Sequence, residues 1–142
     1  ERVIDAYSGI GTIGMIAAKD AKEVISVEAN TDAVADAHWN ARHNNIKNVQ
    51  FYEADAGHFL TQMAKDGEKA DVIFMDPPYS KGLERRVLEV LSTKKFTTDT
   101  LIVVEAALDE DFSYVDALGF EITKDKHYKT NKHVFLMQKE NV

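Results

Sequence analysis

Short apolar runs alternate with longer segments whose apolar side chains recur at helical spacing. The runs are rich in Val and Ile, as is typical of buried strands, and they cover residues 2–7, 23–28, 49–53, 70–75 and 100–105. Helical patterns follow the first four runs: a short one to about residue 19, one from residue 30 or 31 to about 44, one around 59–63, and one around 83–91. Such alternation predicts a parallel sheet covered by helices.

The tail of the chain breaks this alternation. Residues 119–139 predict two strands joined near 128–132, with no helix between them. One of these strands should therefore be antiparallel. We predict an α/β fold with a Rossmann-like, doubly wound, mostly parallel seven-stranded sheet, helices on both faces and a C-terminal antiparallel strand. Residues 1–142 should form a single domain.

Composition narrows the class of protein. Hydrophobic residues make up 44% of the chain and charged residues 29%, as in ordinary soluble domains. We expect no signal peptide and no contact with a membrane, because no apolar run approaches the length of a bilayer span. The chain has no cysteine, which excludes disulfides and thiol nucleophiles and fits a cytoplasmic location. The five histidines show no ligand spacing, so we predict no metal.

The charge balance bears on nucleic acid as a partner. A net charge of −7 opposes nonspecific binding to phosphates, so such a partner would require a local basic patch. Residues 124–133 contain four lysines and two histidines around Tyr128. This stretch can either meet RNA phosphates or form a solvated hairpin, and the sequence leaves both readings open.

A glycine-rich loop follows the first strand. Gly9, Gly11 and Gly14 have the spacing that lets backbone approach a ligand at the start of a helix, with Ser8 in the same loop. The pattern alone is weak, because it also suits a dinucleotide or a tight turn without a ligand.

Acidic residues at the strand ends favour one ligand. Glu28 can accept both hydroxyls of a ribose, and Asp55, followed by Ala56, can accept from an adenine amino group. Asp5 can orient the glycine loop or meet an amino-acid ammonium group. The alternatives are a surface acid for Glu28, a helix cap for Asp55 and a loop brace for Asp5. Ribose, adenine and an amino acid together predict S-adenosylmethionine.

The stretch Asp76-Pro77-Pro78-Tyr79 follows the fourth strand and predicts the chemistry. Prolines donate no backbone hydrogen bonds, so their carbonyls remain available to an NH2 group. Asp76 is a second acceptor, and Tyr79 offers a ring for stacking. We predict methyl transfer to the exocyclic amine of a base, with Asp76, Pro77 and Tyr79 as catalytic residues. The alternative is an ordinary Pro-Pro turn.

These motifs resemble two families. Residues 3–78 are similar to the catalytic domain of RNA uracil-C5 methyltransferases, through residues 5–14, 27–28 and 40–44. From residue 71 onward the chain resembles the 16S ribosomal RNA guanine-N2 methyltransferases, through residues 74–79, 101–105 and 128–130. The resemblance implies S-adenosylmethionine as cofactor, ribosomal RNA as partner and guanine N2 as the methylated amine.

The chain departs from both families. It lacks the cysteine with which the uracil family attacks its base, so covalent uracil-C5 chemistry is excluded. From the start of the sequence at the first strand, we also expect the N-terminal arm of the guanine-N2 family to be absent. The mosaic of two families suggests a recombined chain. The alternative to an active enzyme is a methyltransferase-like domain that binds the cofactor without catalysis. A nicotinamide-dependent oxidoreductase, suggested by the glycines alone, has no evident residue for hydride chemistry.

Overall fold

The fold is a mixed seven-stranded sheet with helices on both faces. The computed structural model describes residues 1–9, 11–77, 83–92 and 99–139. The strands are β1 (Arg2–Ala6), β2 (Glu23–Glu28), β3 (Val49–Glu53), β4 (Val72–Met75), β5 (Leu101–Ala106), β6 (Phe120–His127) and β7 (Lys132–Gln138). The helices are α1 (Thr12–Ala17), α2 (Thr31–His43), α3 (Ala56–Lys65), α4 (Leu83–Ser92) and the 3-10 turn η2 (Ser113–Val115).

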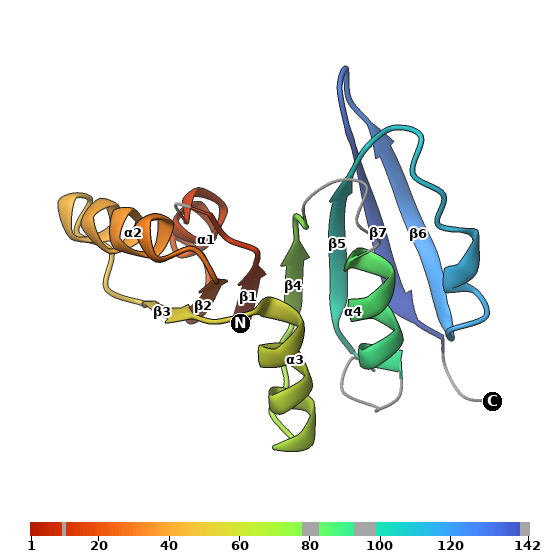
Figure 1. The fold of residues 1–142 in the computed structure, drawn as a ribbon, viewed down its shortest axis with the longest axis horizontal. Coiled ribbons are helices and arrows are strands. Elements are labelled where there is room, and N and C mark those ends of the chain that lie inside the picture. The colour runs from red at the N-terminus through yellow and green to blue at the C-terminus, as the bar shows by residue number, and fades with distance from the viewer. Residues whose placement is uncertain (10, 78–82, 93–98, 140–142) are drawn as a thin grey trace.

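The strand order is β3-β2-β1-β4-β5-β7-β6, as Figure 1 shows from the red β1 to the blue hairpin. The first five strands pair in parallel, whereas β7 runs antiparallel to both β5 and β6. The predicted α/β fold, with a mostly parallel sheet and a C-terminal antiparallel strand, is therefore confirmed.

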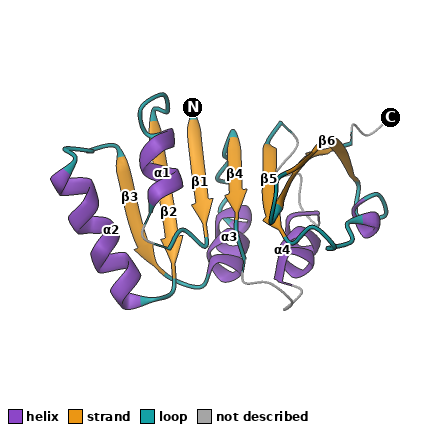
Figure 2. Cartoon of the chain, turned by 90° about the horizontal axis from the view of Figure 1, so that it is seen from above, coloured by secondary structure: helices purple, strands orange, loops and turns teal. Residues whose placement is uncertain are grey.

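Side-chain caps and apolar stripes explain the helices. Asn30 accepts a hydrogen bond from the Ala33 N–H at the start of α2, and Asp55 does the same for His58 at the start of α3. The main core lies between the sheet and α3 and α4, where Leu60, Leu88 and other apolar side chains bury against the strands. Figure 2 shows α1 and α2 on the other side of the sheet.

The α1 face of the sheet carries one continuous row of side chains across all seven strands. Register pairs Phe51 of β3 with Ser26, Ser26 with Asp5, and Asp5 with Phe74. The row continues through Val103 and Phe135 to Lys124. Paired residues in neighbouring strands point to the same face. In the chain described by the structure, α1 and α2 cover the β1–β3 part of this face, and no helix lies over β5, β7 and β6 on it (Figure 2).

No helix in the described chain combines the length and hydrophobicity that a membrane crossing requires.

Candidate active site at the carboxyl edge of the sheet

The functional candidates gather where the parallel strands end. The chain leaves β1 toward β2 and later returns to β4 on the other side of β1, so the strand order reverses there. In open α/β sheets, a crevice for ligands forms at the carboxyl ends of strands beside such a reversal. The residues predicted from the sequence lie near or just after the carboxyl ends of β1, β2, β3 and β4, and the parallel pairing brings these four strand ends to one edge.

The glycine loop is held by backbone hydrogen bonds. The Ser8 N–H donates to the Val27 carbonyl at 3.0 Å, and the Gly11 N–H donates to the Ser8 carbonyl at 2.9 Å. A Cβ atom on Gly9 would meet nothing within 4 Å, so the space beside this backbone is open. The loop therefore presents accessible backbone next to the end of β1.

Glu28 ties this loop to the end of β2. Its Oε1 accepts from the Gly9 N–H at 2.9 Å, and its Oε2 accepts from the Asn30 N–H at 2.8 Å. Asp55 lies one strand further along and caps α3 through Oδ2, directly before the buried Ala56. Each carboxylate keeps acceptor capacity after these bonds, because a carboxylate has about four lone-pair sites.

Asp5 is buried at the centre of the crevice. It is 3% exposed, and its Oδ2 accepts from the Gly14 N–H at 3.0 Å. Burial raises the pKa of Asp5 to about 7; the Gly14 N–H acts against this rise, and the charge of Glu28 adds to it. Asp5 thus braces the start of α1, and it also lines a cavity that extends toward β4 and β5.

That cavity joins Asp5 to a second group of polar side chains. It has a volume of about 170 Å³ and a mainly apolar wall, to which Ile13, Phe74, Met75 and Val103 contribute; its polar residues are Asp5, Asp76, Glu105 and His133. Glu105 of β5 is close enough to Asp76 to raise the pKa of the Asp76 carboxyl group. The His133 Nε2 atom lies 3.1 Å from Glu105 Oε1, and the Asn131 amide donates to the same oxygen at 3.4 Å. Glu105 is therefore the centre of a polar network over three strands.

The carboxyl groups of this edge influence one another. Burial, then the hydrogen bond to Glu105 and the charges of Glu105 and Asp5, raise the pKa of Asp76 to about 7. Asp76 is exposed as a residue, but the cavity walls partly shield its carboxyl group from water. Near neutral pH, Asp76 can therefore exchange a proton with its surroundings, which suits a group that handles an amine.

Most of the predicted residues share this edge. The glycine loop contains Ser8, Gly9 and Gly11; Glu28 accepts from Gly9, and Asp5 accepts from Gly14 at the start of α1. Asp76 lines the cavity on the other side of Asp5 and is followed by the buried Pro77. Tyr79 lies outside the described residues. Sequence reasoning missed Glu105 and His133 as site residues. Glu105 is the last residue of the apolar run 100–105, as Glu28 is of the run 23–28, and that signal was available in the sequence. The position of His133 depends instead on the antiparallel register of β7 and β5.

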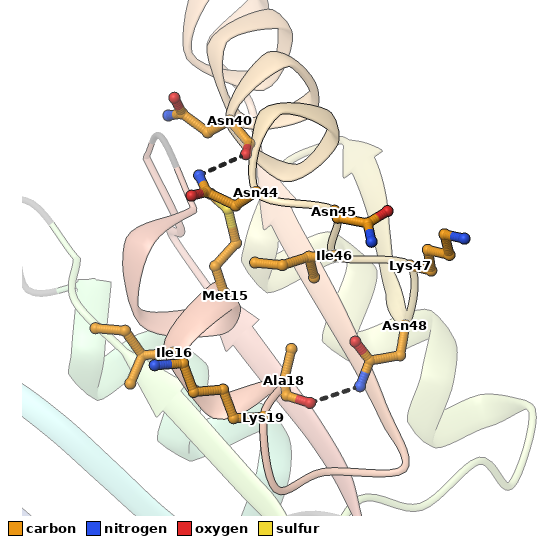
Figure 3. Close-up of a pocket in the computed structure, with 10 residues that line it drawn as sticks. All are labelled: Met15, Ile16, Ala18, Lys19, Asn40, Asn44, Asn45, Ile46, Lys47 and Asn48. Atoms are coloured by element: carbon orange, nitrogen blue, oxygen red, sulfur yellow. Dashed lines mark hydrogen bonds between the residues drawn. The ribbon is translucent and has the colours of Figure 1, made fainter.

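A larger cavity lies away from these groups. It has a volume of about 570 Å³ and is bounded by Met15, Ile16, Ala18, Lys19, Asn40 and residues 44–48 (Figure 3). Two of its asparagine amides already donate hydrogen bonds to backbone carbonyls: Asn48 to Ala18 at 2.8 Å, and Asn44 to Asn40 at 2.9 Å. Because Asn48 precedes β3, this cavity lies toward the opposite edge of the sheet. Within the described ranges, no group of three or more His, Cys, Asp or Glu residues suits a metal ion.

Comparison with known proteins shows which family the chain belongs to. Residues 1–137 match the family described as Conserved hypothetical protein 95. The chain belongs to this family. A single family thus spans both parts of the sequence, and the division into a uracil-C5-like and a guanine-N2-like half, with the recombined chain that it suggested, finds no support.

One curated relative and two solved structures show what else the chain is similar to. A Clostridium tetani protein named an uncharacterized RNA methyltransferase is 35% identical over 127 residues, which are 87% of this chain but 27% of that protein. The ribosomal protein L11 methylase of Lactobacillus delbrueckii superposes with a TM-score of 0.79 at 17% identity, covering 98% of this chain and 70% of that one. An rRNA methylase from Streptococcus thermophilus gives 0.75 at 12%, covering 99% and 87%. At 17% and 12% identity, these two structures establish the fold alone; one is named for a protein substrate and the other for an RNA.

Proposed function

We propose that the chain is an S-adenosylmethionine-dependent methyltransferase domain that methylates an exocyclic amine, the N2 of guanine in ribosomal RNA. Residues 1–142 would act as one domain in the cytoplasm. The observation that carries the proposal is the adjacency of two ligand positions. One is the glycine loop with Glu28 and Asp5, and the other is Asp76 with Glu105, across one cavity. The name of the Clostridium tetani relative supports RNA as the substrate.

The first position fits the proposed cofactor. The Glu28 carboxylate is fixed by two backbone N–H groups and retains lone pairs for the two hydroxyls of a ribose. Asp55 has a second carboxylate oxygen for an adenine amino group. The run of acids from Glu28 through Asp5 to Asp76 suits a ligand that carries positive charge. When bound, S-adenosylmethionine supplies an electrophilic methyl group on a positively charged sulfur.

The second position fits the amine of a base. Asp76 and Glu105 accept hydrogen bonds from its two N–H groups, which orients the nitrogen lone pair. Acceptors placed before the reaction stabilise the positive charge that develops on the nitrogen. The carbonyl of Pro77 is a further acceptor, and Tyr79 holds the plane of the base. After transfer, the nitrogen loses one proton to Asp76, whose pKa of about 7 permits uptake and release.

Transfer of labelled methyl from S-adenosylmethionine to ribosomal RNA tests this proposal, with nucleoside analysis to identify the product. We expect labelled N2-methylguanosine from the wild-type chain and none from Asp76→Ala. The exposed Asp20→Ala should behave as the wild type. Label on another nucleoside would refute the guanine assignment. Cofactor binding without transfer to any RNA would favour the alternative, a methyltransferase-like domain that is inactive by itself; the 27% share of the Clostridium tetani relative that this chain spans motivates that alternative.

A further inference from the structure

The hairpin of β6 and β7 extends past the candidate active site. The last residue of β5, Ala106, pairs with Lys132, so the turn 128–131 lies beyond the end of the neighbouring strand. Figure 1 shows this tip projecting above the sheet, at the edge where β4 ends. Residues 121–130 are all exposed. The hairpin thus offers a surface that is free in the described chain and adjoins Glu105.

One face of the hairpin combines lysines with aromatic rings. The Lys124 ammonium lies 5.6 Å from the ring centre of Phe135, and the Lys126 ammonium lies 5.3 Å from that of Tyr128. Lys129 is exposed at the turn. Within the described residues none of these three lysines forms an ion pair. The intervening acid, Asp125, alternates to the opposite face, where it lies 3.0 Å from His127.

This basic and aromatic face is continuous with the cavity. Lys126 pairs across the strands with His133, and His133 pairs with Glu105. The ring of Tyr128 meets that of His133 edge-on at 4.8 Å. In the described chain no helix covers this face over β5, β7 and β6. An extended ligand could therefore run from the hairpin into the pocket without displacing an element of the fold.

We propose that this hairpin face, defined by Lys124, Lys126, Tyr128, Lys129 and Phe135, binds single-stranded RNA beside the target base. The assignment rests on the proposed function and names the surface that would hold its substrate. The positive charge of the hairpin lysines favours RNA as the ligand of this face. The chain carries −7 overall, and Asp5, Asp76 and Glu105 contribute carboxyl groups to an otherwise mainly apolar cavity; ionised carboxylates repel phosphates. The lysines would hold the phosphates away from those acids, while the rings stack on unpaired bases.

Fluorescence anisotropy with a labelled single-stranded RNA of roughly 12 nucleotides, a length within the range bound by single-stranded RNA platforms, tests the proposal. The test variant is the triple substitution Lys124→Gln, Lys126→Gln and Lys129→Gln. The matched control is Lys19→Gln, Lys22→Gln and Lys47→Gln, which removes the same charge from exposed lysines toward the opposite edge. We expect the test variant to bind the RNA at least about tenfold more weakly. The magnitude of its slope of log affinity against log salt should fall by about 2, because each of the three lost phosphate contacts contributes about 0.7. The control variant should keep the wild-type slope.

Tyr128→Ala tests the stacking separately from the charge. It should weaken binding about tenfold and leave the salt slope unchanged, since stacking on an aromatic ring involves no phosphate. Equal binding by the test and control triple variants, or no RNA binding by the folded wild-type chain, would overturn the proposal. A concentration-dependent dimer that the hairpin variant dissociates, without RNA binding, would assign the face to a second copy and also overturn it.

Cofactor titrations keep this test distinct from that of the proposed function. The hairpin lysines are remote from Glu28, so their variants should bind S-adenosylmethionine as the wild type does. RNA binding that depends on the hairpin, in a chain that does not bind the cofactor, would support the surface and refute the methyltransferase. If the chain binds the cofactor but its RNA affinity does not depend on the hairpin, the hairpin surface is refuted and the methyltransferase proposal stands.

Discussion

His133 Nε2 lies 3.1 Å from Glu105 Oε1, although the two residues are 28 positions apart in the chain. The antiparallel pairing of β7 with β5 produces this contact by placing His133 directly opposite Glu105. Glu105 in turn raises the pKa of the neighbouring Asp76. The C-terminal hairpin therefore contributes a side chain to an edge that is otherwise built from parallel strands, and it connects the hairpin surface to the candidate catalytic acid.

Removing the charge of Glu105 should lower the pKa of Asp76. Burial is the main cause of the rise to about 7 and would remain, but the hydrogen bond and the charge of Glu105 would be lost in Glu105→Gln. Carbon-13 NMR titration of the aspartate carboxyl groups measures the change, with Glu53→Gln at the far edge strand as control. Methyl transfer should rise with pH as Asp76 ionises, and the variant should show this rise at lower pH. An Asp76 pKa that stays near 7 would contradict the assigned network.

Asp5→Asn should stabilise the fold at alkaline pH. The pKa of Asp5 is about 7 in the folded chain and close to its ordinary value of 3.8 in the unfolded chain. The folded state therefore binds the proton more tightly, and the wild type loses stability as pH rises between these values. An asparagine oxygen can still accept from Gly14 and carries no charge.

The stability difference between Asp5→Asn and the wild type should be small at pH 4 and grow to at most about 4 kcal/mol above pH 7. Urea unfolding at a series of pH values measures it, with the exposed Asp20→Asn as the reference substitution. A difference that does not change with pH would show that Asp5 is not desolvated.

Gly11→Ala should destabilise the loop more than Gly67→Ala destabilises its own turn. Both glycines have positive φ, 85° and 73°, so an alanine at either position introduces strain of about 1–2 kcal/mol. At Gly11 the new Cβ would also lie 3.2 Å from Ala37 Cβ and from the methyl carbon of Met15, whereas at Gly67 it would meet nothing within 4 Å. Urea unfolding of both variants gives the comparison. Equal losses would mean that the contacts around Gly11 relax freely.

Local patterns predicted most of the fold. The strands Glu23–Glu28 and Val49–Glu53 lie where the apolar runs placed them, because each run ends at a polar residue that also ends the pairing. The fourth strand begins at Val72 rather than at residue 70. Asp71 instead accepts from the Arg2 N–H through its side chain, a contact between positions 69 apart that local patterns do not reveal.

The candidate site was predictable in part, because local hydrophobic patterns also locate the strand ends. Asp5, Glu28, Asp55 and Asp76 each lie at or after a strand that the pattern identifies, and parallel strands bring their ends to one edge. The hydrogen-bond donors that these acids meet in the fold were not predictable, such as the Gly9 and Asn30 N–H groups that donate to Glu28. The cluster of Asp76, Glu105 and His133 depends on strand order and on the register of β7, which are properties of the whole sheet.

Isothermal titration calorimetry of the chain with S-adenosylmethionine tests the central claim most directly. We predict saturable binding that Glu28→Ala abolishes, because the substitution removes the proposed ribose acceptor and the anchor of Gly9. Asp76→Ala should largely spare binding, since Asp76 belongs to the amine side, and Glu53→Ala should leave it unchanged. A folded wild-type chain that does not bind the cofactor, or a Glu28→Ala variant that binds it as tightly as the wild type, would contradict the account.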